Sequence, residues 1–183
     1  MNYKIQHITN KKKLQGSLNP QYLTIHSTAN LKSTAQNERD WLNSVSNKTT
    51  TGFHIAVDDK EAIECIPLNG KAHHTGNSKG NNTSIGLEIC ESGDRQKTLD
   101  NSVEVTVKIL KQFGWGTDRL KRHYDWSKKH CPRILNYNNW EGWNEFKSKV
   151  QAHLNLLSHD TKTTGKLYRV QVGAYSEREN AEN

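Results

Sequence analysis

Cysteine is scarce in this sequence, with three in 183 residues, and this scarcity limits what the protein can be. Three thiols cannot form a complete disulfide framework, so a reducing compartment is the simpler environment. No two cysteines are spaced as CxxC, which argues against a dithiol redox site and a structural zinc finger. Cys65 and Cys90 lie in apolar, strand-like runs, where we expect buried and inert thiols. Only Cys131 stands among polar residues.

Long apolar runs are absent as well. No segment approaches the roughly 20 apolar residues that cross a bilayer, so we expect no membrane insertion. The start of the chain, MNYKIQHITNKKK, lacks the apolar stretch of a signal peptide, and we expect initial residence in the cytoplasm. Apolar residues make up 32% of the chain and the mean hydropathy is −0.93, yet five Trp and six Tyr argue against disorder.

Acidic residues are fewer than basic ones. Lys and Arg number 26 against 19 Asp and Glu, which gives a formal net charge of +7 and a pI near 9.3. This charge favours polyanionic partners, either nucleic acid or the anionic polymers of a bacterial wall. Charge alone does not choose between them. A nucleic-acid protein would be expected to gather its Lys and Arg on one recognition element.

Four apolar runs predict strands. They are residues 21–28, residues 84–90, and the two arms of a hairpin, residues 53–57 and 62–66. The first run delivers His26 at its C-terminal end, and the run SIGLEIC contains a single acid, Glu88. A carboxylate in a central strand is costly unless it is paired or used in chemistry.

Helical spacing of apolar residues predicts three helices. They are residues 33–46, 99–113 and 139–157. Ser33 and Gln36 have capping-box spacing for the first helix, and Gly114 suits the C-terminal cap of the second. Residues 70–84 are rich in Gly, Asn and Ser and predict a loop. The mixture predicts an α/β (α+β) fold with a central mixed sheet flanked by helices.

Two histidines and one cysteine stand out as possible metal ligands. His26, His123 and Cys131 can form a tetrahedral zinc site with the fourth position open for water, as catalytic zinc requires. Because His26 is far away in sequence, the fold must bring it to the other two. Glu88 can then take a proton from water, and Lys129 can face the negative charge that develops on a carbonyl oxygen.

Other interpretations of these residues stay open on spacing alone. A single histidine among nine is more often a surface or structural residue than a ligand. Cys131 could equally be an ordinary thiol, and Lys128 and Lys129 a solvated charge run. Asp125 is a candidate for orienting a ligand histidine from behind.

Five stretches of the chain resemble one known family. They are YLTIHSTAN around His26, GFHIAVDD around His54, AHHTGN around His74, SIGLEIC around Glu88, and RHYDWSKKHCP. From about residue 22 to about residue 157 the chain resembles the zinc-dependent N-acetylmuramoyl-L-alanine amidases, a family that includes phage lysozyme-type amidases and peptidoglycan-recognition proteins. The resemblance implies one zinc ion per chain on His26, His123 and Cys131. It further implies Glu88 as the catalytic acid and base and Lys129 as the transition-state stabiliser.

The resemblance also implies a substrate groove. His54 and His74 match positions that line this groove in relatives, so we expect substrate contact from both, and from Phe53 beside them. A histidine that only packs the loop is the alternative for His54 and His74. Phe53 stands where some members carry tyrosine, which removes a hydroxyl group. Arg133 follows Cys131-Pro132 where the family usually has glycine, which changes the turn but no metal ligand.

The implied activity is cleavage of the amide between N-acetylmuramic acid and L-alanine in bacterial peptidoglycan. A phage or prophage endolysin, held in the cytoplasm until a holin releases it, fits the sequence best. A host autolysin is one alternative, and a non-catalytic peptidoglycan-binding module of the same fold is another, although binding-only relatives commonly lack the ligand at Cys131. Peptidoglycan is then the expected partner rather than nucleic acid, and the oligomeric state is left open.

Three parts are expected along the chain. Residues 1–157 form the zinc amidase domain, and residues 158–166 are small and polar, as in a linker. Residues 167–183 resemble the opening of a sporulation-related (SPOR) repeat, a module that binds glycan strands. This fragment is too short to bury a core, and we expect no binding activity from it.

Overall fold

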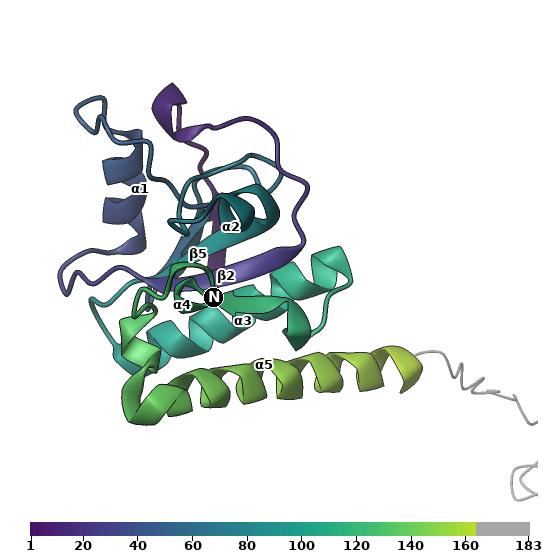
Figure 1. Ribbon diagram of the computed structural model, residues 1–183. Coiled ribbons are helices and arrows are strands. Elements are labelled where there is room, and N and C mark those ends of the chain that lie inside the picture. The colour runs from purple at the N-terminus through teal and green to yellow at the C-terminus, as the bar shows by residue number, and fades with distance from the viewer. Residues whose placement is uncertain (164–183) are drawn as a thin grey trace, which may run out of the picture.

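Six strands form one mixed sheet at the centre of the molecule (Figure 1). The computed structural model describes residues 1–163. In spatial order the strands are β1 (Asn2–Ile5), β4 (Glu61–Glu64), β3 (Ile55–Val57), β5 (Ser84–Ile89), β2 (Tyr22–Ser27) and β6 (Leu120–Arg122). Neighbouring strands are parallel except β3 and β4, which pair antiparallel. The predicted mixed sheet and hairpin are confirmed, and the short edge strands β1 and β6 add to them.

Helices cover both faces of this sheet. Because side chains alternate along a strand, Ile55 and Val57 pack into one apolar cluster and Ala56 into another. The first cluster lies under α3 (Arg95–Phe113), with α5 (Tyr137–Thr163) packed outside it (Figure 1). The second cluster includes residues of α1 (Ala35–Asn43). The middle strands β2 and β5 are therefore buried on both faces and form a rigid platform.

The register of the middle strands fixes where functional side chains meet. His26 of β2 lies directly beside Glu88 of β5 in a parallel pair. On the other side of β2, β6 also runs parallel and leads straight into α4, which spans His123–Ser127. Carboxyl ends of parallel strands meet at one edge of a sheet, where α/β proteins place their sites. His26, Glu88 and His123 thus converge at the same edge.

Helix boundaries differ from the sequence prediction in physically clear ways. The first helix is capped by Thr34, whose side chain accepts from the Asn37 backbone N–H, so the predicted cap at Ser33 is wrong by one residue. The helix α3 begins at Arg95 behind an Asp94 cap, four residues before the predicted start. Its predicted C-terminal cap is confirmed, since Gly114 has a φ of 66°.

Two predicted irregular segments contain helix. Within residues 70–84, the helix α2 (Ser78–Thr83) is capped by the Asn77 side chain, which accepts from the Gly80 N–H. The last helix, α5, continues to Thr163, so residues 158–163 of the expected linker are helical. The rest of that linker and the SPOR-like stretch, residues 167–183, lie outside the described residues. Among the described helices, none has the length and apolar character needed to cross a membrane.

Candidate metal centre

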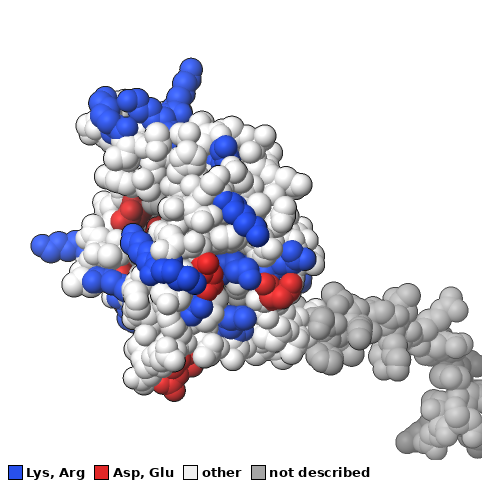
Figure 2. All heavy atoms as spheres, in the orientation of Figure 1, with Lys and Arg blue, Asp and Glu red and all other residues white. Residues whose placement is uncertain are grey.

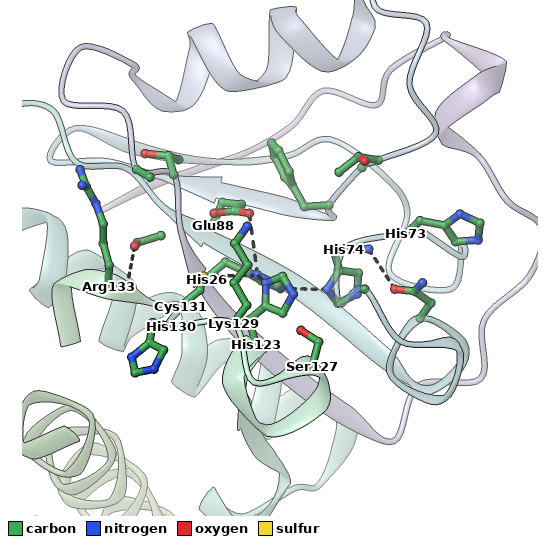
Figure 3. Close-up of a pocket in the computed structure, with 18 residues that line it drawn as sticks. His26, His73, His74, Glu88, His123, Ser127, Lys129, His130, Cys131 and Arg133 are labelled. Carbon is green, nitrogen blue, oxygen red and sulfur yellow. Dashed lines mark hydrogen bonds and ion pairs between the residues drawn. The ribbon is translucent and has the colours of Figure 1, made fainter. Parts of the chain in front are cut away.

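A cavity of about 510 Å³ opens at the carboxyl edge of the sheet (Figure 3). Its wall includes His26, Glu88, His123, Lys129 and Cys131. These are the residues that the sequence singled out for chemistry, delivered by β2, β5, α4 and the loop that follows α4. The fold therefore brings together groups that are separated by as many as 105 positions in the sequence.

Three of these side chains form a compact set of possible metal ligands. The Nδ1 atoms of His26 and His123 lie 3.0 Å apart, and the Cys131 Sγ lies 3.8 Å from the His26 Nδ1. Tetrahedral zinc with ordinary bond lengths separates two nitrogen ligands by about 3.3 Å and a nitrogen from a sulfur by about 3.6 Å. All three residues are buried, and their ligand atoms lie within 4.8 Å of one another. The donor set and its spacing fit a zinc ion.

Burial prepares the two nitrogen ligands for a cation. It lowers the pKa of His26 well below the ordinary value, and it lowers the pKa of His123 to about 4, with Lys129 adding to the effect. Both imidazoles are therefore neutral near pH 7 and offer a lone pair, as a metal ligand must. Burial likewise raises the pKa of the Cys131 thiol to about 12. A thiolate at this position needs a neighbouring positive charge such as a metal ion.

Glu88 stands next to this set, with one carboxyl oxygen facing His26 and the other without a partner. Its Oε1 lies 3.9 Å from the His26 Nδ1, and its Oε2 is buried with no hydrogen-bond partner. Burial raises the pKa of Glu88 to about 8, an effect that the positive charge of Lys129 opposes. Figure 3 shows the Lys129 side chain extending over the cavity toward Glu88. The arrangement provides a proton acceptor and a cation on the same side of the ligand set.

The ring nitrogens that face away from the ligand set are also held. The His26 Nε2 is 2.9 Å from the Nδ1 of His74, and the His74 Nε2 is 3.0 Å from the Ser84 carbonyl oxygen. The backbone of Thr75 raises the pKa of His123 and so opposes the effect of burial. The Ser84 partner is a backbone carbonyl group, which no residue-type signal in the sequence could reveal.

The expected substrate contact of His54 is wrong. Its side chain is fully buried, its Nδ1 accepts from the Gly86 N–H, and its Nε2 donates to the Gly70 carbonyl oxygen. With both nitrogens used by the backbone, His54 joins two segments of the fold and has no polar atom left for a ligand. His74 lines the cavity, but its two ring nitrogens are likewise occupied. Phe53 also lines the cavity, and its contact with substrate stays a prediction.

The expected role of Asp125 behind a ligand histidine is also wrong. Its carboxylate accepts from the Arg122 backbone N–H at 2.7 Å and from the Arg122 guanidinium group at 2.6 Å. Asp125 lies in the first turn of α4, three residues after Arg122, where a carboxylate caps the helix start. It therefore stabilises the helix that carries His123 rather than the imidazole itself.

Arg133 contributes a clasp that the sequence did not predict. Its guanidinium Nε and one terminal nitrogen contact the Glu91 carboxylate at 2.9 and 2.6 Å, and its backbone N–H donates to the Ser27 hydroxyl. Two parallel N–H···O bonds fix orientation as well as charge. The segment that follows Cys131 is thereby tied to the ends of β2 and β5.

Comparison with known proteins identifies the family to which the chain belongs. Residues 16–134 match the family described as N-acetylmuramoyl-L-alanine amidase, and the chain belongs to this family. It is 40% identical over 161 residues to the N-acetylmuramoyl-L-alanine amidase CwlA of Bacillus subtilis (strain 168), covering 83% of this chain and 57% of that protein. It is also 40% identical over 151 residues to XlyB of the same organism, covering 78% of this chain and 46% of that protein.

A solved structure shows the same architecture. The catalytic domain of XlyA matches with a TM-score of 0.75 and 32% identity, over 82% of this chain and 99% of that one. The amidase fold inferred from the motifs is confirmed. The chain spans about half the length of the curated relatives that it matches.

Proposed function

We propose that the protein hydrolyses the amide bond between N-acetylmuramic acid and L-alanine in bacterial peptidoglycan, with one zinc ion held by His26, His123 and Cys131. The observation that carries this proposal is a buried ligand set beside Glu88, whose Oε2 has no partner. A buried carboxyl oxygen without a hydrogen bond is costly, and reactive chemistry explains its position. The names of the relatives CwlA and XlyB supply the bond that is cut.

The residues around the cavity divide the chemistry among them. A zinc ion at this site would polarise the scissile carbonyl group and lower the pKa of a water molecule. Glu88 takes the proton of the attacking water and passes it to the alanine nitrogen as the C–N bond breaks. Its pKa of about 8 lies near neutrality, where one group can both accept and donate a proton. Lys129 places its ammonium group near the oxygen on which negative charge develops.

The alternatives differ in what they require of the site. A binding module of the same fold needs neither a buried thiol in a ligand set nor an unpartnered carboxyl oxygen, and this chain has both. Figure 2 shows Lys and Arg spread over one face, with acidic side chains among them in its middle. On this face the basic side chains do not gather on the one element that a nucleic-acid protein would be expected to show. The net charge of +7 instead suits an anionic bacterial wall.

The biological setting follows from the same substrate. We propose action at the bacterial wall as a phage or prophage endolysin, released from the producing cell by a holin. A host autolysin would share the catalytic site. Deletion of the gene for this protein from a lysogen, followed by induction of the prophage, separates the endolysin from the autolysin. An endolysin is needed for the lysis that follows induction, and an autolysin is not.

Digestion of purified peptidoglycan tests the reaction itself. New amino groups and new reducing sugars are followed together, and the released amino termini are identified. We expect N-terminal alanine without new reducing ends, and we expect one zinc ion per chain in the active protein. New reducing ends would identify a glycosidase and refute the proposal. A protein that binds peptidoglycan without releasing amines or holding zinc would be the binding module instead.

A further inference from the structure

We infer that His74 is a positioning residue that fixes which ring nitrogen of His26 faces the ligand set. This inference rests on the proposed zinc site and deepens it. The motif AHHTGN led to the expectation of substrate contact by His74, but the hydrogen bonds of its ring point to the metal ligand behind the groove (Figure 3).

The first step is the direction of the hydrogen bonds. The Ser84 carbonyl oxygen can only accept, so the His74 Nε2 at 3.0 Å must carry the proton. A neutral imidazole has one N–H, which leaves the His74 Nδ1 as an acceptor. The His26 Nε2 at 2.9 Å then donates to it. The consequence is that the His26 Nδ1 keeps its lone pair on the side of His123 and Cys131.

The second step is the confinement of the His74 ring. A Cβ atom at Gly86 would lie 2.8 Å from the His74 Cγ and Nδ1, closer than such contacts occur, so only glycine leaves room for this ring. On another side, the rings of His54 and His74 meet edge to face, with centroids 5.7 Å apart. His54 is itself anchored to the backbone at Gly86 and Gly70. These contacts therefore fix the position and the orientation of the His74 ring.

The third step is the backbone that carries the ring. The Asn81 side-chain oxygen accepts from the backbone N–H groups of both His74 and Thr75, at 3.0 and 2.9 Å. The backbone of Thr75 also acts on His123, whose pKa it raises. One segment, tethered by α2, thus supplies the partner of His26 and influences His123 as well. This gives the loop between β4 and β5 a role in building the metal site.

The general consequence of losing such a partner is known in magnitude. Groups that hydrogen-bond a metal-bound histidine fix its tautomer and ring orientation, and their removal weakens metal binding by roughly 10–100-fold. In His74→Phe a somewhat larger aromatic ring takes the place of the imidazole, and the acceptor for the His26 N–H is lost. In His74→Gln an amide oxygen can accept from His26 while the amide nitrogen donates to Ser84. The pair separates the hydrogen bond from the packing.

Two measurements on each purified variant test the inference. The zinc dissociation constant is measured by competition with a chelator, and the ring nitrogens of His26 are assigned in metal-free protein by ¹⁵N NMR. We expect the Nε2–H form of His26 in the wild type and its loss in His74→Phe, with zinc binding about 10–100-fold weaker. We expect His74→Gln to recover most of the affinity. His73→Phe, at the neighbouring position, is the matched control and is expected to leave both measurements unchanged.

The outcomes separate this inference from the proposed function. A folded His74→Phe that binds zinc as tightly as the wild type, with the same His26 tautomer, overturns the positioning role and leaves the zinc site intact. Equal weakening in folded His74→Gln and His74→Phe also overturns it, because packing rather than the acceptor would then decide affinity. A wild-type protein that binds no zinc overturns the proposed function. In that case the tautomer of metal-free His26 still decides what His74 does.

Discussion

Glu88 is the residue on which the proposed chemistry depends most directly. It lies in β5 between Leu87 and Ile89, which are both fully buried. Its own side chain is 17% exposed, on the side of the cavity. Because burial raises the pKa of Glu88 to about 8, the metal-free protein holds this carboxyl group largely protonated at neutral pH. An ordinary surface carboxyl group would be fully ionised there and a weaker proton donor.

Glu88→Gln is expected to separate metal binding from catalysis. The amide keeps the size of the side chain but cannot take a proton from water, so we expect the rate of amide cleavage to fall by about 10²–10⁴-fold. Zinc content should remain one ion per chain, because the three ligands are unchanged. Amine release from peptidoglycan and metal analysis of the same sample check both statements. Loss of zinc together with activity would show that Glu88 is structural.

At the scale of the elements, one buried lysine holds the segment between α1 and β3 in place. Lys13, in the short helix η1 (Lys11–Lys13), is fully buried and donates from Nζ to the Asn47 Oδ1, the Thr49 carbonyl and the Thr49 hydroxyl. The ammonium group also lies 5.1 Å from the centre of the Trp41 ring. A few residues further on, the same segment supplies Thr51 and Gly52 to the cavity wall. Lys13 therefore stabilises the segment that forms one side of the cavity.

Lys13→Met is expected to lower the stability of the folded protein, because these hydrogen bonds are lost. The methionine fills much of the same space but takes away the donor of the Thr49 carbonyl oxygen, at a cost of about 1–3 kcal/mol, whereas the Asn47 Oδ1 keeps its hydrogen bonds from Thr49. Urea denaturation of metal-free protein measures the free energy of unfolding. Lys12→Met is the matched control, since Lys12 is exposed and should change stability little. Equal stability of the two variants would contradict the role given to Lys13.

Those site residues that stand in a recognisable strand could be predicted from the sequence. His26 and Glu88 stand in apolar strands, and the parallel register then brings them together. The roles of His54 and His74 were not predictable, because three of their four hydrogen-bond partners are backbone groups, at Gly70, Gly86 and Ser84, and the fourth is His26. Backbone partners carry no residue-type signal.

Asp125 differs, because a signal for its true role was present. It follows Arg122 by three residues at the start of a short helix, which is the spacing of a capping box. The proximity of Asp125 to His123 in sequence suggested a contact that the helix geometry does not make. Local spacing therefore predicts caps more reliably than it predicts partners of a buried imidazole.

For the whole molecule, buried imidazoles make the metal-free fold sensitive to acid. Burial lowers the pKa of His54 to about 4, of His74 to about 3 and of His123 to about 4. In the unfolded chain these groups titrate near 6.5. Their contribution to stability is therefore complete above pH 6.5 and is lost as the pH falls toward the folded values. Glu88 acts in the opposite sense between its unfolded value and about 8, and Glu38, whose pKa burial also raises, acts in that sense too, but the buried imidazoles outnumber these two groups.

We expect the free energy of unfolding of metal-free protein to fall as the pH drops below about 6.5. Each net proton taken up on unfolding lowers it by about 1.4 kcal/mol per pH unit. Urea denaturation in the presence of a chelator, at several pH values within this window, gives the slope. A profile that stays flat or rises on acidification would show that the imidazoles do not remain neutral in the folded protein.

Zinc binding should release protons, because the ligand set is protonated at its sulfur before the metal arrives. The Cys131 thiol has a pKa of about 12, so it holds its proton at neutral pH and must lose it to become a ligand. Isothermal titration calorimetry in two buffers of different ionisation enthalpy gives the number of protons released per zinc ion. We expect Cys131→Ser to release about one proton fewer than the wild type and to bind zinc more weakly.

Glu88→Gln is a second comparison for the number of protons released. Glu88, which has a pKa of about 8, is also protonated in part at neutral pH, so its replacement should lower that number without weakening the three ligands. Equal proton release by the wild type and Cys131→Ser would mean that the sulfur is not a ligand, and the metal site would then have to be built from other atoms.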